Sequence, residues 1–261
     1  MRAAILALGA LATLAGCAVP DAHVPPFARA PYEALSRASV VEIALREWRA
    51  FGQVIDDGTD KPEPAEGAER APGMWQRVGE YWWLGLNADR PEIAWTGKHD
   101  ARGRVFPPSE DGQFAWSAAF ISYVMRIAGA GKRFPYAPSH WEYIDAARRA
   151  ADGSGDTVVV AERPEAYAPR PGDLICQGRG RARDLRYEHL PAGPFPAHCD
   201  IVVRVIPGAL DVVGGNVLDA VAMKRVPTTP DGKLAAPDGA VQDAKHPWMV
   251  VLRLRLPGPT S

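Results

Sequence analysis

The second half of the chain consists of short strand-like segments, and this pattern limits the possible folds more than any other feature. After residue 155, runs of valine, isoleucine and leucine alternate with turns rich in glycine and proline. Aliphatic and β-branched runs bounded by such turns are typical of β-strands. A largely antiparallel sheet is therefore predicted from the segments TVVVAE, GDLICQG, HCDIVVRVI, ALDVVGGN, AVAMKRV and WMVVLRLRL.

The first half has helical spacing instead. Ser39 and Glu42 are spaced as in a capping box, at the start of the first helical segment. Residues 117–128 are apolar nearly all round, which indicates a buried helix. The acidic residues 54–73, rich in proline and glycine, are predicted to form a surface loop. Helices followed by strands predict an α+β fold with helices packed on the sheet. The predicted helices cover residues 39–51, 74–86, 117–128 and 139–152.

The N-terminus predicts export. One arginine precedes a short apolar run, which ends in the letters LAGC. This ending resembles the bacterial lipobox, in which the cysteine becomes the lipidated first residue of the mature protein. The expected organisation is a lipoprotein signal peptide at 1–16, a lipidated Cys17 with a flexible tether at 17–33, and one domain at 34–256. The alternative is a plain secretory signal. Ala18 in place of aspartate favours the outer membrane, facing the periplasm.

Charge and motif content exclude several partners. The 30 basic and 31 acidic residues give a net charge of -1, so a nucleic-acid partner is not expected. The sequence has neither a metal-binding cysteine-histidine spacing nor a cofactor motif, and no oligomeric state is indicated. Apart from Cys17, the cysteines are Cys176 and Cys199. In an exported domain these two either form a disulfide or remain as buried thiols, and both alternatives are open.

Two regions carry side chains suited to catalysis. Strand alternation places His198 and Asp200 on the same side of HCDIVVRV, opposite Cys199 and Ile201, which we expect to face the core. Ser117 lies at the start of the buried helix, where unpaired N–H groups favour a developing negative charge. Serine is also a common N-cap, and it needs a base to become a nucleophile.

The order of these motifs resembles a known group of enzymes. WSAAFISYVMRIAG, RPGDLICQG, HCDIVVRV and VVGGN follow one another as in the papain-like cell-wall amidases of the CHAP and NlpC types. Those enzymes place a cysteine at the head of a buried helix and a histidine at the start of a later strand. The sequence is most similar to the bacterial family called domain of unknown function 2272, in which serine is expected at that helix head. The resemblance spans roughly residues 74–226.

The resemblance implies a papain-like core and a role for each matching residue. Ser117 takes the place of the nucleophile, His198 that of the general base, and Asn216 that of the residue that orients the imidazole. Asp200 competes with Asn216 for this last role, and Asp173 in PGDL is expected to stabilise a turn. Because a hydroxyl replaces the thiol, the site is either a serine variant or an inactive site that retains a binding groove.

Substrate contacts are expected from residues around this site. Trp116 precedes Ser117, and His140 either lines the same cleft or packs beside Trp141. Arg179 and Arg183, in a long loop, are suited to bind the carboxylates of cell-wall peptides. The first functional hypothesis is a cell-envelope amidase or peptidase acting on peptidoglycan. The second is an inactive envelope lipoprotein that binds peptidoglycan or another envelope partner.

Overall fold

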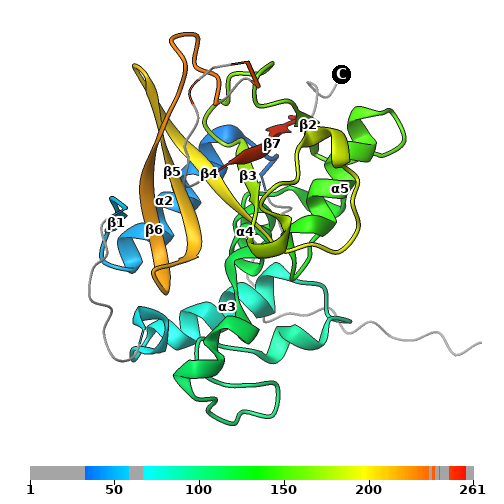
Figure 1. Ribbon diagram of the computed structural model, residues 1–261. Coiled ribbons are helices and arrows are strands. Elements are labelled where there is room, and N and C mark those ends of the chain that lie inside the picture. Colours follow the sequence, from blue (N-terminus) through cyan, green and yellow to red (C-terminus); the bar gives the residue numbers. More distant parts are fainter. Residues whose placement is uncertain (1–32, 59–66, 235–236, 239–240, 242–246, 257–261) are drawn as a thin grey trace, which may run out of the picture. The chain divides into compact units, whose positions relative to one another are not determined.

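The predicted strands form one mixed seven-stranded sheet in the computed structural model of the protein (Figure 1). The structure describes residues 33–58, 67–234, 237–238, 241 and 247–256. The strand order is β1-β6-β5-β4-β3-β7-β2, and every neighbouring pair is antiparallel except β1 and β6. The strands are β1 (Val54–Asp56), β2 (Val159–Glu162), β3 (Leu174–Gly178), β4 (Ala197–Ile206), β5 (Ala209–Val217), β6 (Ala220–Pro227) and β7 (Trp248–Leu254).

The helices pack as the α+β prediction requires. Three of them, α2, α4 and α5, contact strands of the sheet, while α3 packs against α4 on the side away from the sheet (Figure 1). The α-helices are α2 (Arg37–Ala50), α3 (Met74–Gly85), α4 (Ser117–Ile127) and α5 (His140–Ala151). Short 3₁₀ turns lie in the connections between helices and strands: η1 (Ala68–Arg70), η2 (Pro91–Ala94), η3 (Pro108–Phe114), η4 (Gly131–Arg133), η5 (Gly180–Ala182) and η6 (Tyr187–His189).

Both faces of the central strands are buried. One hydrophobic cluster includes Cys199 and Ile201 of β4 together with the buried face of α4, and it is the main core. A second cluster includes Val202 and Val251. The sequence correctly predicts that Cys199 and Ile201 face the core. The opposite side of β4 is not open, however, because His198 is 4% exposed and Asp200 is fully buried.

Two local predictions were wrong. The first helix begins at Arg37, and its capping box joins Ser36 and Ser39 rather than Ser39 and Glu42. Ser36 accepts from the backbone N–H of Ser39, so the helix starts earlier than predicted. Residues 54–56 were predicted to begin a surface loop but form β1, which pairs with β6 in parallel. The pairing partner, β6, lies far along the chain, so the three residues of β1 carry no sequence pattern that predicts a strand.

The two cysteines form a disulfide between neighbouring strands. Cys176 of β3 lies directly opposite Cys199 of β4, and the two Cα atoms are 4.1 Å apart. Both side chains are fully buried. Of the two alternatives that the sequence left open, the structure contains the disulfide.

Asp173 stabilises the entry to β3. Its fully buried carboxylate accepts hydrogen bonds from the Arg37 guanidinium at 2.7 Å and the Leu254 backbone N–H at 2.8 Å. The other oxygen accepts from the Tyr167 hydroxyl and the Arg170 backbone N–H, both at 2.9 Å. One side chain therefore joins α2, the turn before β3 and the end of β7, in agreement with the structural role predicted for it.

The predicted signal peptide (1–16), Cys17 and the tether up to residue 32 lie outside the described residues. The described elements belong to a unit that begins at Glu33. Within the described part of the chain, no helix combines the length and the apolar character needed to cross a membrane.

Candidate functional site

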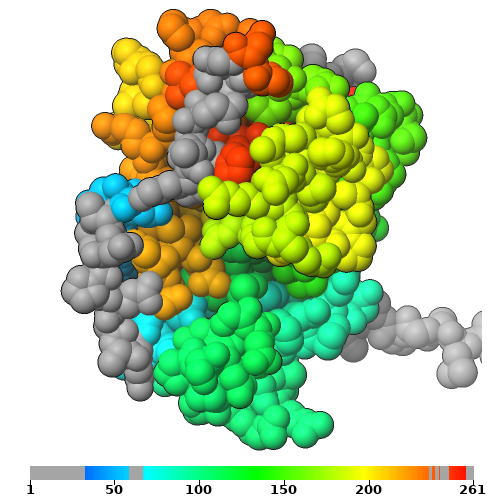
Figure 2. All heavy atoms as spheres, viewed as in Figure 1, coloured from blue at the N-terminus to red at the C-terminus, as the bar shows by residue number. Residues whose placement is uncertain are grey.

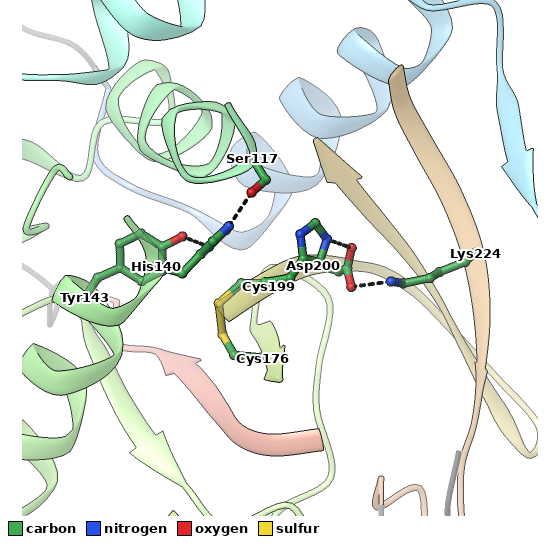
Figure 3. Close-up of a disulfide and its surroundings, with 8 residues drawn as sticks. Ser117, His140, Tyr143, Cys176, Cys199, Asp200 and Lys224 are labelled. Atoms are coloured by element: carbon green, nitrogen blue, oxygen red, sulfur yellow. Dashed lines mark hydrogen bonds and ion pairs between the residues drawn. A yellow bond between two sulfur atoms is a disulfide. The ribbon is translucent and has the colours of Figure 1, made fainter. Parts of the chain in front are cut away.

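Ser117 and His140 meet at the first residues of two helices. Ser117 begins α4 and His140 begins α5, and the Ser117 Oγ lies 2.6 Å from the His140 Nε2 (Figure 3). The other ring nitrogen of His140, Nδ1, is hydrogen-bonded to the Tyr143 hydroxyl. Tyr143 follows His140 by three residues, so the two side chains share one side of α5. The result is a hydrogen-bonded series of hydroxyl, imidazole and phenol.

The start of α4 also supplies backbone donors. The first N–H groups of an α-helix have no partner within the helix and carry partial positive charge. No side chain caps the start of α4. Ser117 is 9% exposed and Ala118, the next residue, lines the same cleft. An oxyanion that forms beside Ser117 would thus meet unused N–H groups.

A second histidine lies beside the first. The ring centroids of His140 and His198 are 5.5 Å apart. The His198 Nε2 is 3.0 Å from one oxygen of Asp200, and the Lys224 ammonium is 2.9 Å from the other (Figure 3). Lys224 comes from β6, so this second series extends across β4 and β5 to the neighbouring strand.

Gly214 makes room for this second series. A Cβ on Gly214 would collide with Asp200 Oδ1 and lie 3.0 Å from His198 Nε2. On Gly215, a Cβ would lie 2.6 Å from the Cβ of Phe120 in α4. The two glycines in VVGGN therefore allow β5 to approach both the His198–Asp200 pair and the buried helix.

Burial keeps both histidines neutral. It holds the pKa of His140 well below its ordinary value, and the neighbouring His198 lowers it further. Burial also lowers the pKa of His198, against the opposing effect of Asp200. Burial likewise raises the pKa of Tyr143, so the phenol stays protonated. Neutral imidazole has one N–H, and when Nδ1 carries it toward Tyr143, Nε2 is free to accept the Ser117 proton.

Asp200 is the negative charge of the site. Burial alone would raise the pKa of its carboxyl, but the Lys224 ammonium and His198 outweigh that effect and hold the pKa below its ordinary range. The carboxylate is therefore ionised while the adjacent histidines are neutral. It also raises the pKa of His140, opposing the effect of burial. A proton arriving on His140 would be stabilised by this nearby charge.

Ser117 and His140 open onto a cleft of about 310 Å³. Its lining combines aromatic and aliphatic residues with polar ones, and Glu92 is its acidic member. A concave site that combines apolar residues with a few placed polar groups is typical of ligand-binding sites. The lining residues are Trp82, Glu92, Trp95, Gln113, Ala115, Ser117, Ala118, Pro138, Ser139, His140, Phe195, Pro196 and Ala197.

The structure brings only some of the sequence-predicted residues together. The histidine in contact with Ser117 is His140, expected at most to line the cleft, whereas His198 binds Asp200. Asn216 lines a different cavity and, among the described residues, is not a hydrogen-bond partner of His198. Of the two residues considered as the orienter of His198, Asp200 makes the contact. A serine, two histidines and an aspartate are therefore adjacent. The motifs do not predict which histidine contacts Ser117 and which contacts Asp200.

Three of the four expected substrate contacts are placed elsewhere. Trp116 is 1% exposed, and its indole N–H donates to Glu69 in the core, so this side chain does not suit contact with a substrate. Arg179 and Arg183 line the cavity that contains Asn216, not the Ser117 cleft. The loop that carries them is the yellow-green segment that occupies much of the face shown in Figure 2.

Sequence reasoning missed Tyr143 and Lys224. Tyr143 had an available signal, because its spacing of three from His140 on a predicted helix places both on one side. Lys224 had none, since its position beside Asp200 depends on how β4, β5 and β6 pair. Within the described ranges, no group of three or more histidine, cysteine or acidic side chains is arranged to hold a metal ion.

Glu69, which accepts the Trp116 indole N–H, makes the stability of the fold depend on pH. This carboxyl is 3% exposed, and burial raises its pKa to about 8, with Asp219 and Asp111 adding to the shift. The pKa in the folded protein exceeds the ordinary value of 4.5. At low pH the carboxyl is protonated in both the folded and the unfolded protein, so its ionisation does not lower the stability there. Its contribution to folding falls as pH rises from about 4.5 through about 8.

We therefore expect Glu69→Gln, which resembles the protonated acid, to remove this fall in stability. The measurement is the free energy of unfolding in urea from pH 5 to pH 9, for the wild type and the variant. The difference between the two proteins should change in favour of the variant with rising pH. A difference independent of pH would contradict the buried, protonated carboxyl beside Trp116.

Comparison with known proteins identifies a family but no activity. No curated protein and no solved structure matches the chain. One family model does match, described as an uncharacterized protein conserved in bacteria, DUF2272, and it covers residues 69–254. This range includes Ser117, His140, His198 and Lys224, hence every element of the site. The chain thus belongs to the bacterial DUF2272 family.

Proposed function

We propose that the protein is a cell-envelope hydrolase that cleaves an amide bond in peptidoglycan peptides, with Ser117 as nucleophile and His140 as general base. The observation that carries this proposal is the 2.6 Å contact between the Ser117 Oγ and the His140 Nε2 at the mouth of a cleft. A serine needs a neutral base within hydrogen-bond distance, and His140 meets both conditions.

The proposed reaction proceeds by acyl transfer. The Ser117 Oγ attacks the carbonyl carbon as its proton passes to the His140 Nε2. The resulting oxyanion accepts hydrogen bonds from N–H groups in the first turn of α4. His140 then gives the proton to the leaving amine, and the C–N bond breaks. Water hydrolyses the acyl-enzyme by the same steps, which releases the acid and restores Ser117.

The second series of side chains stabilises the charged intermediate. When His140 takes the proton, a cation forms in a buried position. The Asp200 carboxylate, held by His198 and Lys224, is the nearby counter-charge that lowers the cost of that step. Tyr143 keeps the ring of His140 oriented toward Ser117. His198 thus has an electrostatic role, while direct proton transfer belongs to His140.

The fold and location are part of the same proposal. The proposed nucleophile stands at the head of α4, which packs on the sheet, and His198 is the second residue of β4; this arrangement supports a papain-like core. The lipobox-like LAGC and Ala18 support a lipoprotein held at the outer membrane, facing the periplasm. A tethered hydrolase at that surface would reach the peptidoglycan layer.

The direct test is incubation of the full-length protein with purified peptidoglycan, followed by measurement of new amine termini. We expect the wild type to release amines and Ser117→Ala to release none. Ser154→Ala provides the matched control, because this serine is exposed beyond the end of α5. Equal release by the wild type and Ser117→Ala would contradict the role of Ser117. Binding of peptidoglycan by the wild type without any released amine would favour the inactive binding lipoprotein.

A further inference from the structure

Glu92 is an acidic residue of the Ser117 cleft that the proposed reaction does not use. It lies in η2, which packs against α3, and its side chain is partly buried. Among the described residues that line the cleft, it is the one charged side chain, because burial keeps His140 neutral. The cleft therefore carries a negative charge that the hydrolysis alone does not explain.

The Glu92 carboxylate lacks a counter-charge. Its Oε2 atom is buried and has no hydrogen-bond partner, and no lysine or arginine in the described part of the chain forms an ion pair with it. Arg90, two residues earlier, is paired with Glu142 instead. The buried carboxylates of Asp173 and Asp200, in contrast, are each paired with a cation. A buried polar atom without a partner is costly and calls for an explanation, and a cationic group of a ligand would provide one.

Aromatic residues line the same cleft. Trp95 follows Glu92 by three residues and packs edge to face against Trp82, with the ring centroids 5.1 Å apart. Phe195 lines the cleft from the loop before β4. The face of an aromatic ring attracts a cation, and this attraction grows where water is excluded. The cleft thus combines a carboxylate with aromatic rings, and both bind ammonium groups.

The cleft also has an electropositive part. Ser117 and Ala118 lie at the start of α4, where free N–H groups and the helix dipole carry partial positive charge. This part suits the carbonyl oxygen of the amide that Ser117 attacks, whereas the Glu92 carboxylate suits a cation. A substrate that carries both groups would be held in one orientation.

We propose that Glu92 is a specificity-determining residue, which binds a primary ammonium group of the substrate in the same cleft as the amide that Ser117 attacks. The ammonium donates hydrogen bonds to the carboxylate and lies against the aromatic rings. The substrate class is therefore a peptide with a free amine close to the scissile bond, on a side chain or at the N-terminus. The inference rests on the proposed function for the identity of that bond, but ammonium binding can be measured without hydrolysis.

The test is isothermal titration of full-length Ser117→Ala, which cannot cleave the probes, and of the wild type. The probes are N-acetyl-alanyl-lysyl-alaninamide, trialaninamide, and the fully acetylated, uncharged form of each. We expect the lysyl peptide, trialaninamide or both to bind about tenfold more tightly than the acetylated form, as a hydrogen bond to a charged group allows.

The two amine probes distinguish the sources of the ammonium. A preference for the lysyl peptide alone would indicate a side-chain amine, and one for trialaninamide alone would indicate an N-terminal amine. Equal binding of free and acetylated forms would overturn the proposal. Failure of every probe to bind up to about 10 mM would overturn it as well.

Glu92→Gln is expected to abolish the tenfold preference, because glutamine keeps the shape of the side chain and loses the charge. Its affinity for the acetylated peptides should equal that of the parent protein. Asp89→Asn is the matched control, since Asp89 is an exposed acid three residues before Glu92 and does not line the cleft. It should keep the full preference. Equal losses in Glu92→Gln and Asp89→Asn would reduce the effect to general surface charge and overturn the role of Glu92.

Failure of this inference can be told apart from failure of the proposed function. A preference for the ammonium peptides in a protein that releases no amine from peptidoglycan would contradict the catalytic proposal and support the role of Glu92. Release of amines by a wild type that binds free and acetylated peptides equally would contradict the role of Glu92 alone.

Discussion

Replacing His140 with alanine is expected to lower kcat/KM for the proposed hydrolysis about a thousandfold. The variant removes the base in contact with the Ser117 hydroxyl, and a positioned base contributes roughly 10² to 10⁴ to such reactions. His198→Ala should cost less, about tenfold, because it disturbs only the Asp200 counter-charge near His140. The measurement is the rate of amine release from peptidoglycan by each purified variant.

His189→Ala is the control for these variants, since His189 is exposed in the loop between β3 and β4. It should retain the wild-type rate. A larger loss for His198→Ala than for His140→Ala would assign the proton transfer to His198, as the family resemblance first implied. In that case the contact between Ser117 and His140 in Figure 3 would be structural rather than catalytic.

The pH profile provides a second measurement of the same assignment. Burial holds the pKa of His140 well below its usual value of 6.5, and only the neutral ring accepts a proton. Activity should therefore stay constant as pH falls through 6.5 and decline only at clearly lower pH. A decline centred near 6.5 would indicate a solvent-exposed histidine as the base.

Replacing Asp173 with alanine is expected to lower the free energy of unfolding by about 3–5 kcal/mol, a large part of the total for a domain. The variant leaves the Arg37 guanidinium, the Tyr167 hydroxyl and two backbone N–H groups without their acceptor. The loss should appear as a lower midpoint in urea unfolding monitored by tryptophan fluorescence.

Asp173→Asn is the conservative comparison. It keeps the shape and one acceptor oxygen, so a smaller loss of about 1–3 kcal/mol is expected. Asp156→Ala removes an exposed acid that pairs with Arg133 and should change stability by less than about 1 kcal/mol. If Asp173→Ala were no more destabilising than Asp156→Ala, the carboxylate would not join α2 to β3 and β7 as described.

Sequence reasoning was most successful where local pattern decides structure. The strands of the second half are aliphatic and β-branched runs between turns, and each of them lies in the sheet. The helix from Ser117 was predicted to be buried because it lacks a polar face, and its residues through Met125 are buried. In contrast, β1 is a short acidic segment whose strand character depends on β6, so its own sequence carries no signal.

The candidate site was only partly predictable, for a geometric reason. Side-chain alternation placed His198 and Asp200 on one side of β4, and the structure has them in contact. Which histidine reaches Ser117 depends on how the start of α5 packs against the start of α4, and sequence spacing does not encode this. The arginines show the same limit, because proximity in the chain did not reveal that they line a separate cavity from Ser117.

The disulfide has a practical consequence for any experiment on the candidate site. Gln177 follows Cys176 directly, His198 precedes Cys199 directly, and the two residues face each other in the strand pairing. The covalent link is thus one residue from the buried Gln177 and one residue from the histidine beside the Ser117–His140 pair. Protein prepared in a reducing cytosol would lack that link beside His198. Assays should therefore begin with material whose oxidation state has been verified by mass spectrometry.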